Sequence, residues 1–122
     1  AAKGLDNLCA VVDNNNLQID GSVAEVNSPY PIPEKFRAFG WNATVVDGTK
    51  MAEIDAALAA LPEVTLNGKP NCIICSTQKG QGVKFMEERP SAWHIGGFSD
   101  ETLAETLELI DAYTKERLAE VE

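Results

Sequence analysis

The sequence has few cysteines, histidines and methionines, and it has no long apolar run. It contains three cysteines, one histidine and two methionines among 122 residues. An odd cysteine count without regular spacing argues against a disulfide framework and favours a reducing compartment. No run approaches the roughly 18 consecutive apolar residues of a membrane-spanning helix, and the N-terminus has no signal-peptide pattern. We therefore expect a cytoplasmic protein with no membrane partner.

Basic residues are also scarce. Lys and Arg number 10 against 19 Asp and Glu, which gives a net charge of −9. A chain this acidic is repelled by polyanions, so we expect no nucleic acid partner. A length of 122 residues suits one domain or part of one, and it excludes a multidomain enzyme within this chain alone.

Two of the cysteines form a Cys-x-x-Cys pattern at Cys72 and Cys75. A redox pair of this kind normally lies at a helix N-terminus, which lowers the pKa of the thiol. Here the pair lies inside an apolar run typical of a buried strand, where residues three apart point to opposite faces. The pattern therefore favours two thiols in the hydrophobic core over a redox pair.

Short apolar runs alternate with helical patterns along the chain. We predict strands near residues 8–13, 42–47 and 71–76, and helices near residues 33–39, 50–61 and 99–120. The first strand has an apolar run from Leu8 to Val12 and is expected to be buried on both faces. Apolar stripes are predicted at Met51, Ile54, Leu58 and Leu61 in the second helix, and at Leu103, Leu107, Ile110 and Leu118 in the third.

The connections between these elements are predicted to be loops. Residues 21–33 are rich in Ser, Asn and Pro, and residues 77–98 hold scattered glycines, so both stretches are expected to lack regular structure. The alternation of strands and helices indicates an α/β fold with a parallel sheet. Three strands are few for such a sheet, so we expect the chain to be part of a larger one.

Ligands of open α/β sheets bind beyond the carboxyl ends of the strands. The loop Asp13–Gly21 follows the first strand and supplies carboxamide, carboxylate and backbone oxygens, which are ligands for Mg²⁺ or Ca²⁺. It is not an EF-hand, because Leu17 and Gln18 occupy the fifth and sixth positions. The alternative is an ordinary turn rich in Asn and Asp.

A second loop, Thr77–Gly82, follows the third strand and contains Lys-Gly-x-Gly. Glycines let a backbone approach a phosphate, and Lys79 adds positive charge, although the loop is not a Walker A motif. His94 lies further along, directly after Trp93, and is the single histidine. Its side chain ordinarily titrates near neutral pH, so His94 is a candidate for proton transfer, with a structural role as the alternative.

Together these segments resemble the transketolase family, and in particular the short N-terminal subunits of its two-subunit bacterial members. The resemblance covers essentially the whole chain in the right order. It is carried by Leu5-Asp6-Asn7-Leu8, Val12-Asp13-Asn14-Asn15-Asn16-Leu17-Gln18-Ile19-Asp20-Gly21, Pro33–Trp41, Val46-Asp47-Gly48, Thr77-Gln78-Lys79-Gly80-Gln81-Gly82 and Trp93-His94.

The resemblance implies a site for thiamine diphosphate and Mg²⁺. It implies that the Asn15 side chain and the Leu17 carbonyl ligate the ion, and that Ile19 packs against the thiazolium ring. It also implies that Lys79 reaches the cofactor and that His94 lies near the diphosphate and the substrate. Residues 1–122 would form the C-terminal part of a diphosphate-binding domain, and the Gly-Asp-Gly that opens the family's motif is absent from them. After His94 the sequence departs from the family, which commonly has a glycine and then a nearby proline.

The implied reaction moves a two-carbon ketol unit from a ketose phosphate to an aldose phosphate, as in the pentose phosphate pathway. The implied partner is a C-terminal transketolase subunit with the pyrimidine-binding domain, in a hetero-oligomer with a dimeric core. Alternatives are a deoxyxylulose-phosphate synthase, a sulfosugar transketolase, or a non-catalytic fragment that serves in assembly. No residue of this chain can be assigned as the glutamate that activates the cofactor in that family, so the resemblance requires a partner.

Overall fold

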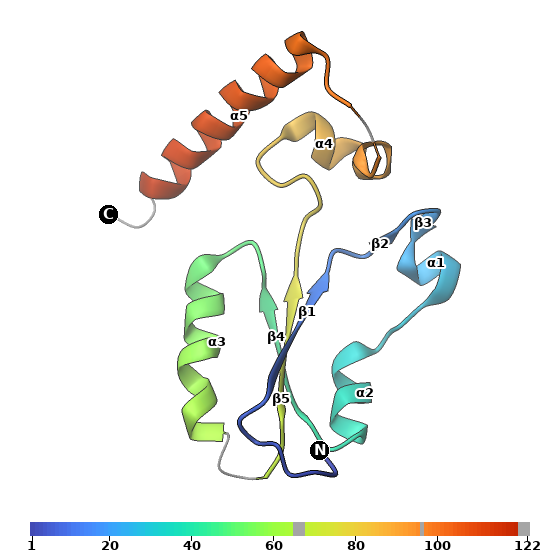
Figure 1. Ribbon diagram of the computed structural model, residues 1–122, viewed down its shortest axis with the longest axis vertical. Helices are drawn as coiled ribbons and strands as arrows, with labels where there is room; N and C mark the ends of the chain where they lie inside the picture. The colour runs from blue at the N-terminus through green and yellow to red at the C-terminus, as the bar shows by residue number, and fades with distance from the viewer. Residues whose placement is uncertain (65–67, 96, 120–122) are drawn as a thin grey trace. The chain divides into compact units, whose positions relative to one another are not determined.

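The computed structural model describes residues 1–64, 68–95 and 97–119. The chain divides into two compact units, Ala1–Thr77 and Gln78–Glu122, and each is described by itself (Figure 1). Within the described ranges, no helix combines the length and apolar character that a membrane span needs.

The first unit is built on a parallel sheet of three strands, β1 (Cys9–Asn14), β4 (Asn42–Asp47) and β5 (Asn71–Ser76). Their order is β1-β5-β4, and every pairing is parallel. The register aligns the three carboxyl ends, because Asn14 and Asp47 both pair with Ser76. The predicted strands and the α/β fold are confirmed, and Figure 1 shows the three arrows pointing the same way.

β5 forms the centre of the sheet because it is the strand with a neighbour on each side. Cys72 is 1% exposed, and Ile73 and Ile74 are also buried. Cys72 and Cys75 are free thiols in the core, as predicted. Burial raises the pKa of the Cys72 thiol, with smaller contributions from Cys9 and Cys75, so this thiol is protonated and unreactive at neutral pH.

β1 is less buried than its apolar sequence predicts. Val11 is 64% exposed, and Leu8, just before the strand, is also exposed. The expectation of a strand buried on both faces is therefore wrong for this chain. The reason is position, since among the described residues β1 pairs with β5 alone and forms an edge of the sheet.

Two helices lie on opposite sides of the sheet in Figure 1, α2 (Ile32–Ala38) and α3 (Met51–Val64). α2 has a proline near its start, and the chain turns out of it at Gly40, where φ is +84°. The predicted helix over residues 33–39 is confirmed with a shift of one residue at each end.

α3 packs on Val46, Ile73 and Cys75 through Ile54, Ala57 and Leu61. The predicted stripe is thus wrong for Met51 and Leu58, which are exposed, because the helix contacts the sheet along a face that includes a small alanine. The helix also runs to Val64 and not only to Leu61. Pro62 costs the last turn one backbone hydrogen bond but does not end the helix.

Residues 17–27 contain short regular elements, whereas the sequence predicts a loop there. β2 (Leu17–Gln18) and β3 (Gly21–Ser22) form an antiparallel pair, and α1 (Val23–Asn27) follows directly. Ser22 caps α1, because its Oγ accepts a hydrogen bond from the Glu25 N–H at 3.3 Å. The Ser-x-x-Glu spacing is the sequence signal that points to this helix.

The second unit also has more helix than predicted. The stretch predicted to be a long loop contains α4 (Lys84–Glu88) and a 3₁₀ turn (Pro90–Trp93). α5 (Asp100–Ala119) confirms the last predicted helix within the described residues, and residue 120 lies outside them. Ser99 caps it, accepting from the Thr102 N–H at 3.2 Å.

The inner face of α5 differs from the predicted stripe. Leu103, Leu107, Ile110 and Leu118 are exposed. Thr106 is the buried residue, and half-buried residues continue its face at Thr102, Leu109, Tyr113 and Arg117. The buried face of α5 is therefore rotated by about one residue relative to the predicted apolar stripe. This face includes Tyr113, whose ring lies against the loop at Gly82, since an added Gly82 Cβ would lie 2.8 Å from it.

Candidate functional site

The turn after β1 carries the two predicted magnesium ligands. Asn15 Oδ1 accepts a hydrogen bond from the Leu17 N–H at 2.9 Å, and both residues are half-buried. Asn16, between them, has a φ of 59°, in the left-handed region that asparagine tolerates better than most residues. The Asn15 side chain and the Leu17 carbonyl thus belong to one tight turn.

This turn fits a hard cation that also has other ligands. A carboxamide oxygen has two lone pairs, and Asn15 Oδ1 gives one of them to Leu17, which leaves the other for a metal. Within the described part of the chain, no three His, Cys, Asp or Glu side chains gather where they could hold a metal ion. The two candidate ligands themselves, a carboxamide and a backbone carbonyl, are neutral oxygens, a pair that suits Mg²⁺ when phosphate oxygens supply the charge.

Ile19 lies on the connection between β2 and β3 and is 68% exposed. An apolar side chain held outward beside a polar turn is available to pack against the face of a flat ring. Its predicted contact with the thiazolium ring stays a prediction.

The aligned strand ends are tied together close to this turn. The Thr77 hydroxyl donates to Asp13 Oδ1, and the Thr77 N–H donates to the Asn14 carbonyl at 3.2 Å. On the other side, the Gly48 N–H donates to the Ser76 carbonyl at 2.8 Å. The ends of β1, β5 and β4 therefore form one connected edge.

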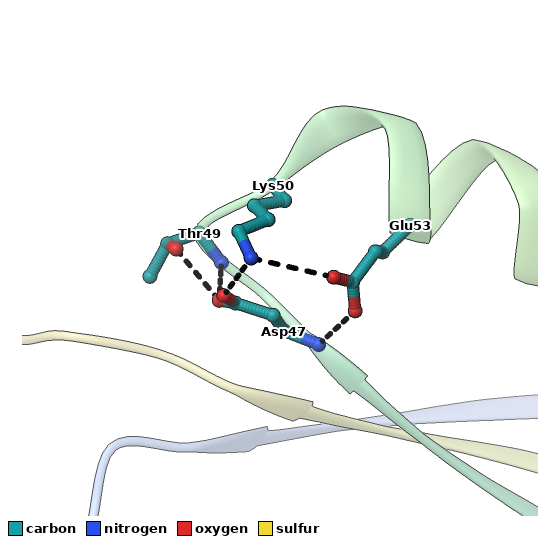
Figure 2. A network of polar contacts seen from close by, with 4 residues as sticks. All are labelled: Asp47, Thr49, Lys50 and Glu53. Carbon is teal, nitrogen blue, oxygen red and sulfur yellow. Dashed lines mark hydrogen bonds and ion pairs between the residues drawn. The ribbon is translucent and has the colours of Figure 1, made fainter.

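The end of β4 is fixed by a polar network that also holds the start of α3. Figure 2 shows Asp47 Oδ1 accepting from the Thr49 hydroxyl at 2.6 Å and from the Thr49 N–H at 3.0 Å. Lys50 Nζ lies 3.3 Å from Asp47 Oδ2 and 3.6 Å from Glu53 Oε1. Glu53 Oε2 accepts from the Asp47 N–H at 2.8 Å.

Charges in this network stabilise each other. Hydrogen bonds from Thr49, and then the neighbouring Lys50, lower the pKa of the Asp47 carboxyl. Asp47 in turn raises the pKa of Lys50. Both oxygens of Asp47 already have partners within the chain. This carboxylate therefore stabilises the end of β4 and is poorly suited to ligate a metal.

The glycine loop of the second unit is packed against its neighbours. Gly80 and Gly82 have φ of +81° and +88°. An added Cβ would lie 2.7 Å from Met86 Cβ at the first position and 2.8 Å from the Tyr113 ring at the second. The glycines therefore allow the loop to contact α4 and α5 closely. The sequence alone explains them only by the approach of the backbone to a phosphate.

Backbone amides of this loop donate within the unit. The Gln81 N–H donates to the Gln78 carbonyl, the Val83 N–H donates to the Gly80 carbonyl, and the Gly82 N–H donates to Glu87 Oε1 at 2.9 Å. These three amides are not free to cradle a phosphate as a P-loop does. Lys79, which is half-buried, is therefore the group of this loop that best fits an anionic cofactor.

Tyr113 holds the loop from α5. Its ring lies against Gly82, and its hydroxyl accepts a hydrogen bond from Gln81 Nε2. No local pattern links a helix residue to a loop more than 30 positions earlier, so sequence reasoning missed this contact.

His94 follows the 3₁₀ turn and its side chain is exposed. Its backbone N–H donates to the Ser91 carbonyl at 3.3 Å. The preceding residue is anchored, since the Trp93 ring lies 5.2 Å from Phe85 and 5.7 Å from Phe98 between centroids. The imidazole thus faces solvent on a turn fixed by an aromatic cluster. The segment after His94, where the sequence departs from the family pattern, includes Gly96, which lies outside the described residues.

The structure therefore groups the predicted residues in two sets. Asn15, Leu17 and Ile19 belong to the unit Ala1–Thr77, and Lys79 and His94 belong to the unit Gln78–Glu122. Within the first unit, the two oxygen ligands share a turn at the carboxyl edge of the sheet. Within the second, α4 connects the Lys79 loop to the His94 turn through Phe85 and Trp93.

Residues 1–109 match the family model described as transketolase, thiamine diphosphate binding domain. The chain belongs to the transketolase family. The predicted identity of the thiamine diphosphate-binding domain is thereby confirmed.

Two relatives are subunits of transketolases. The chain is 41% identical over 83 residues to the 6-deoxy-6-sulfo-D-fructose transketolase subunit SqwG of Clostridium sp. (strain MSTE9), and the match covers 68% of this chain and 30% of that protein. It is 35% identical over 116 residues to a subunit of the apulose-4-phosphate transketolase of Phocaeicola vulgatus, and this match covers 92% of this chain and 40% of that protein. The chain thus spans well under half the length of both relatives.

The fold agrees with that of a solved transketolase. A mutant transketolase from Pichia stipitis superposes with a TM-score of 0.58 and 24% sequence identity, covering 96% of this chain and 20% of that one. At this identity the likeness supports the α/β fold alone. It is consistent with the parallel three-stranded sheet described above.

Proposed function

We propose that this chain is part of the thiamine diphosphate-binding subunit of a two-subunit transketolase, and that it uses Mg²⁺ to hold the cofactor. The observation that carries the proposal is the match of residues 1–109 to the thiamine diphosphate binding domain of transketolases. The oxygen pair on the Asn15–Leu17 turn supports the magnesium part of it.

Each site residue then has a role that follows from its chemistry. Asn15 Oδ1 and the Leu17 carbonyl hold the Mg²⁺, and Ile19 packs against the face of the thiazolium ring. Lys79 offsets the negative charge of the diphosphate. Bound thiamine diphosphate supplies the carbanion chemistry of the reaction. His94, exposed on an anchored turn, donates hydrogen bonds to anionic oxygens of the cofactor and the substrate.

The proposed reaction transfers a two-carbon ketol unit from a ketose phosphate to an aldose phosphate, in the cytoplasm and within the pentose phosphate pathway. The proposed partner is a C-terminal transketolase subunit with the pyrimidine-binding domain, in a hetero-oligomer with a dimeric core. The subunit names of the two relatives support the need for a partner.

A sulfosugar donor is the second candidate. The relative from Clostridium is named for 6-deoxy-6-sulfo-D-fructose and is 41% identical over its aligned residues. Sulfonate and phosphate are both tetrahedral oxyanions, so the same cationic and hydrogen-bonding groups can accept either. An apulose 4-phosphate donor, the substrate named for the Phocaeicola relative, keeps the phosphate.

The test uses the gene product that contains this sequence, co-expressed with its partner subunit. Thermal unfolding is first measured with and without thiamine diphosphate and Mg²⁺. We expect both together to raise the melting temperature more than either alone. No stabilisation by the cofactor would contradict the proposal and favour a non-catalytic role in assembly.

Product analysis then identifies the reaction. The assembled enzyme is given xylulose 5-phosphate, 6-deoxy-6-sulfofructose or apulose 4-phosphate with an aldose phosphate acceptor. We expect aldose products shortened by two carbons from a phosphorylated ketose. Release of a product only from the sulfosugar would support the second candidate. Condensation of pyruvate with an aldose phosphate would instead indicate a deoxyxylulose-phosphate synthase.

A further inference from the structure

Tyr30 contacts the asparagine-rich turn from a distant part of the same unit. Its hydroxyl lies 2.9 Å from Asn14 Oδ1 and 3.3 Å from Asn16 Oδ1. The two contacts span 16 and 14 positions of sequence. They place one phenol across the two residues that flank the candidate ligand Asn15.

The tyrosine is itself held in place. Its N–H donates to Ser28 Oγ at 3.3 Å, and the residue is 37% exposed. Nearby, Lys35 Nζ donates to the Pro29 carbonyl at 2.6 Å. The segment before α2 is therefore tied to that helix, and it presents the hydroxyl to the turn after β1.

Tyr30 contacts the turn at Asn16, the residue with an unfavourable backbone conformation. Asn16 has a φ of 59°, a conformation that costs free energy for a residue other than glycine. Its carbonyl accepts from the Val23 N–H at 3.0 Å, while its side chain contacts Tyr30. Asn16 is thus held from two sides, and its conformation sets the direction of Leu17, whose carbonyl is the second candidate ligand.

We infer that Tyr30 is a positioning residue for the magnesium-binding turn. Its hydroxyl holds Asn14 and Asn16 so that the Asn15 carboxamide and the Leu17 carbonyl are preorganised before the ion binds. The inference rests on the proposed function for the identity of the ion. Preorganisation lowers the conformational entropy that binding must overcome, so it strengthens the affinity for the ion.

The first test measures the turn without any ligand. Hydrogen exchange of the Leu17 and Val23 amides is followed in the assembled protein free of metal and cofactor, for the wild type and Tyr30→Phe. Loss of a hydrogen bond near 1 kcal/mol predicts exchange about five-fold faster. Tyr113→Phe, which removes a tyrosine hydroxyl from the other unit, is the matched control and should leave both amides unchanged.

A second variant guards against an indirect effect of Tyr30→Phe. Asn14→Ala removes the closer acceptor and should speed exchange by a similar factor. If the Tyr30–Asn14 contact is the cause, the double variant exchanges no faster than either single variant. Unchanged exchange in Tyr30→Phe, or fully additive effects in the double variant, would overturn the inference.

The final arm separates this inference from the proposed function. Calorimetric titration with Mg²⁺ in the presence of thiamine diphosphate gives the apparent Kd, which we expect to be about five-fold weaker in Tyr30→Phe. The kcat at saturating Mg²⁺ should be nearly unchanged. An unchanged Kd in the variant would overturn the inference alone, whereas a wild type that needs no Mg²⁺ to bind the cofactor would overturn the proposed function and the inference with it.

Discussion

The indole of Trp93 lies nearly parallel to the ring of Phe98, with an angle of 20° between their planes and 5.7 Å between their centroids. Phe85 contacts the same indole at 5.2 Å. This cluster joins α4, the 3₁₀ turn and the segment before α5. His94 is the next residue, so the position of its backbone depends on an aromatic cluster that the imidazole itself does not join.

Removing the indole should therefore destabilise the turn and displace His94. We expect Trp93→Ala to lower the free energy of unfolding by roughly 2–4 kcal/mol, from lost burial and two ring contacts. Trp93→Phe keeps an aromatic ring and should lose less than half of that. Denaturant unfolding measures the stability, and kcat/KM of the assembled enzyme should fall in the same order. Equal stability of Trp93→Ala and wild type would contradict the anchoring role.

His94→Ala should lower kcat/KM by about two to three orders of magnitude, the effect of losing one hydrogen-bond donor to developing charge. Excess Mg²⁺ should not restore the rate, because the loss lies in the transition state. Steady-state kinetics across a Mg²⁺ titration measures both features. Near-normal kcat/KM with sugar phosphates would show that the histidine is structural.

Asn15→Ala should instead weaken the apparent affinity for Mg²⁺ and cofactor. One neutral oxygen ligand is lost while the phosphate oxygens remain, so excess Mg²⁺ should restore part of the activity. The same titration serves as the measurement, with His94→Ala as the comparison that excess metal does not repair. A rate that does not respond to Mg²⁺ would contradict the assignment of Asn15 to the metal.

Gly48→Ala should destabilise the first unit by about 1–3 kcal/mol, because the added methyl group overpacks the end of β5. The new Cβ would lie 2.7 Å from Thr77 Cγ2 and 2.8 Å from Cys75 Cβ. Gly97→Ala is the matched control, since its Cβ would meet nothing within 4 Å. Thermal unfolding of both variants tests this, and equal melting temperatures would refute the close approach.

Asp47→Asn should lower stability at neutral pH and lose this effect in acid. The pKa of Asp47 is lowered in the folded protein from its ordinary value of 3.8. The carboxylate therefore contributes stability above pH 3.8, and that contribution disappears as the pH falls through the lowered folded value. Melting temperatures of variant and wild type should differ above pH 3.8 and draw together as the pH falls further below that value. Asp55→Asn, a change at an exposed residue of the neighbouring helix α3, is the control and should leave the acid dependence intact.

The main strands and helices could be predicted from sequence because each is bounded by a local signal. Apolar runs end at polar turns for β1, β4 and β5, and Ser99 marks the start of α5. The two candidate ligands Asn15 and Leu17 could likewise be assigned to one turn, since they are two residues apart.

Two features could not be predicted from the sequence. One is which of two similar faces a helix buries, and the other is the set of contacts between residues far apart in the chain. α5 buries Thr106 while Leu107 is 54% exposed, because tertiary contacts outweigh a weak apolar stripe. Tyr30 and Tyr113 act on loops far from them in the chain. Neither has a local pattern that distinguishes it from an ordinary surface tyrosine.

The side chain of Asn71 touches both edges of the sheet, and this has a consequence for how the protein folds. It accepts from Asn42, 29 residues earlier, and donates to the Asp6 carbonyl, 65 residues earlier. Chain closure becomes costlier with length, by about 0.6 kcal/mol for each doubling. The topology therefore favours pairing of β4 with β5 before docking of β1, although β1 precedes both strands in the chain. Because the Asn15 turn follows β1, we expect the turn that carries the proposed metal ligands to form after β4 and β5 have paired.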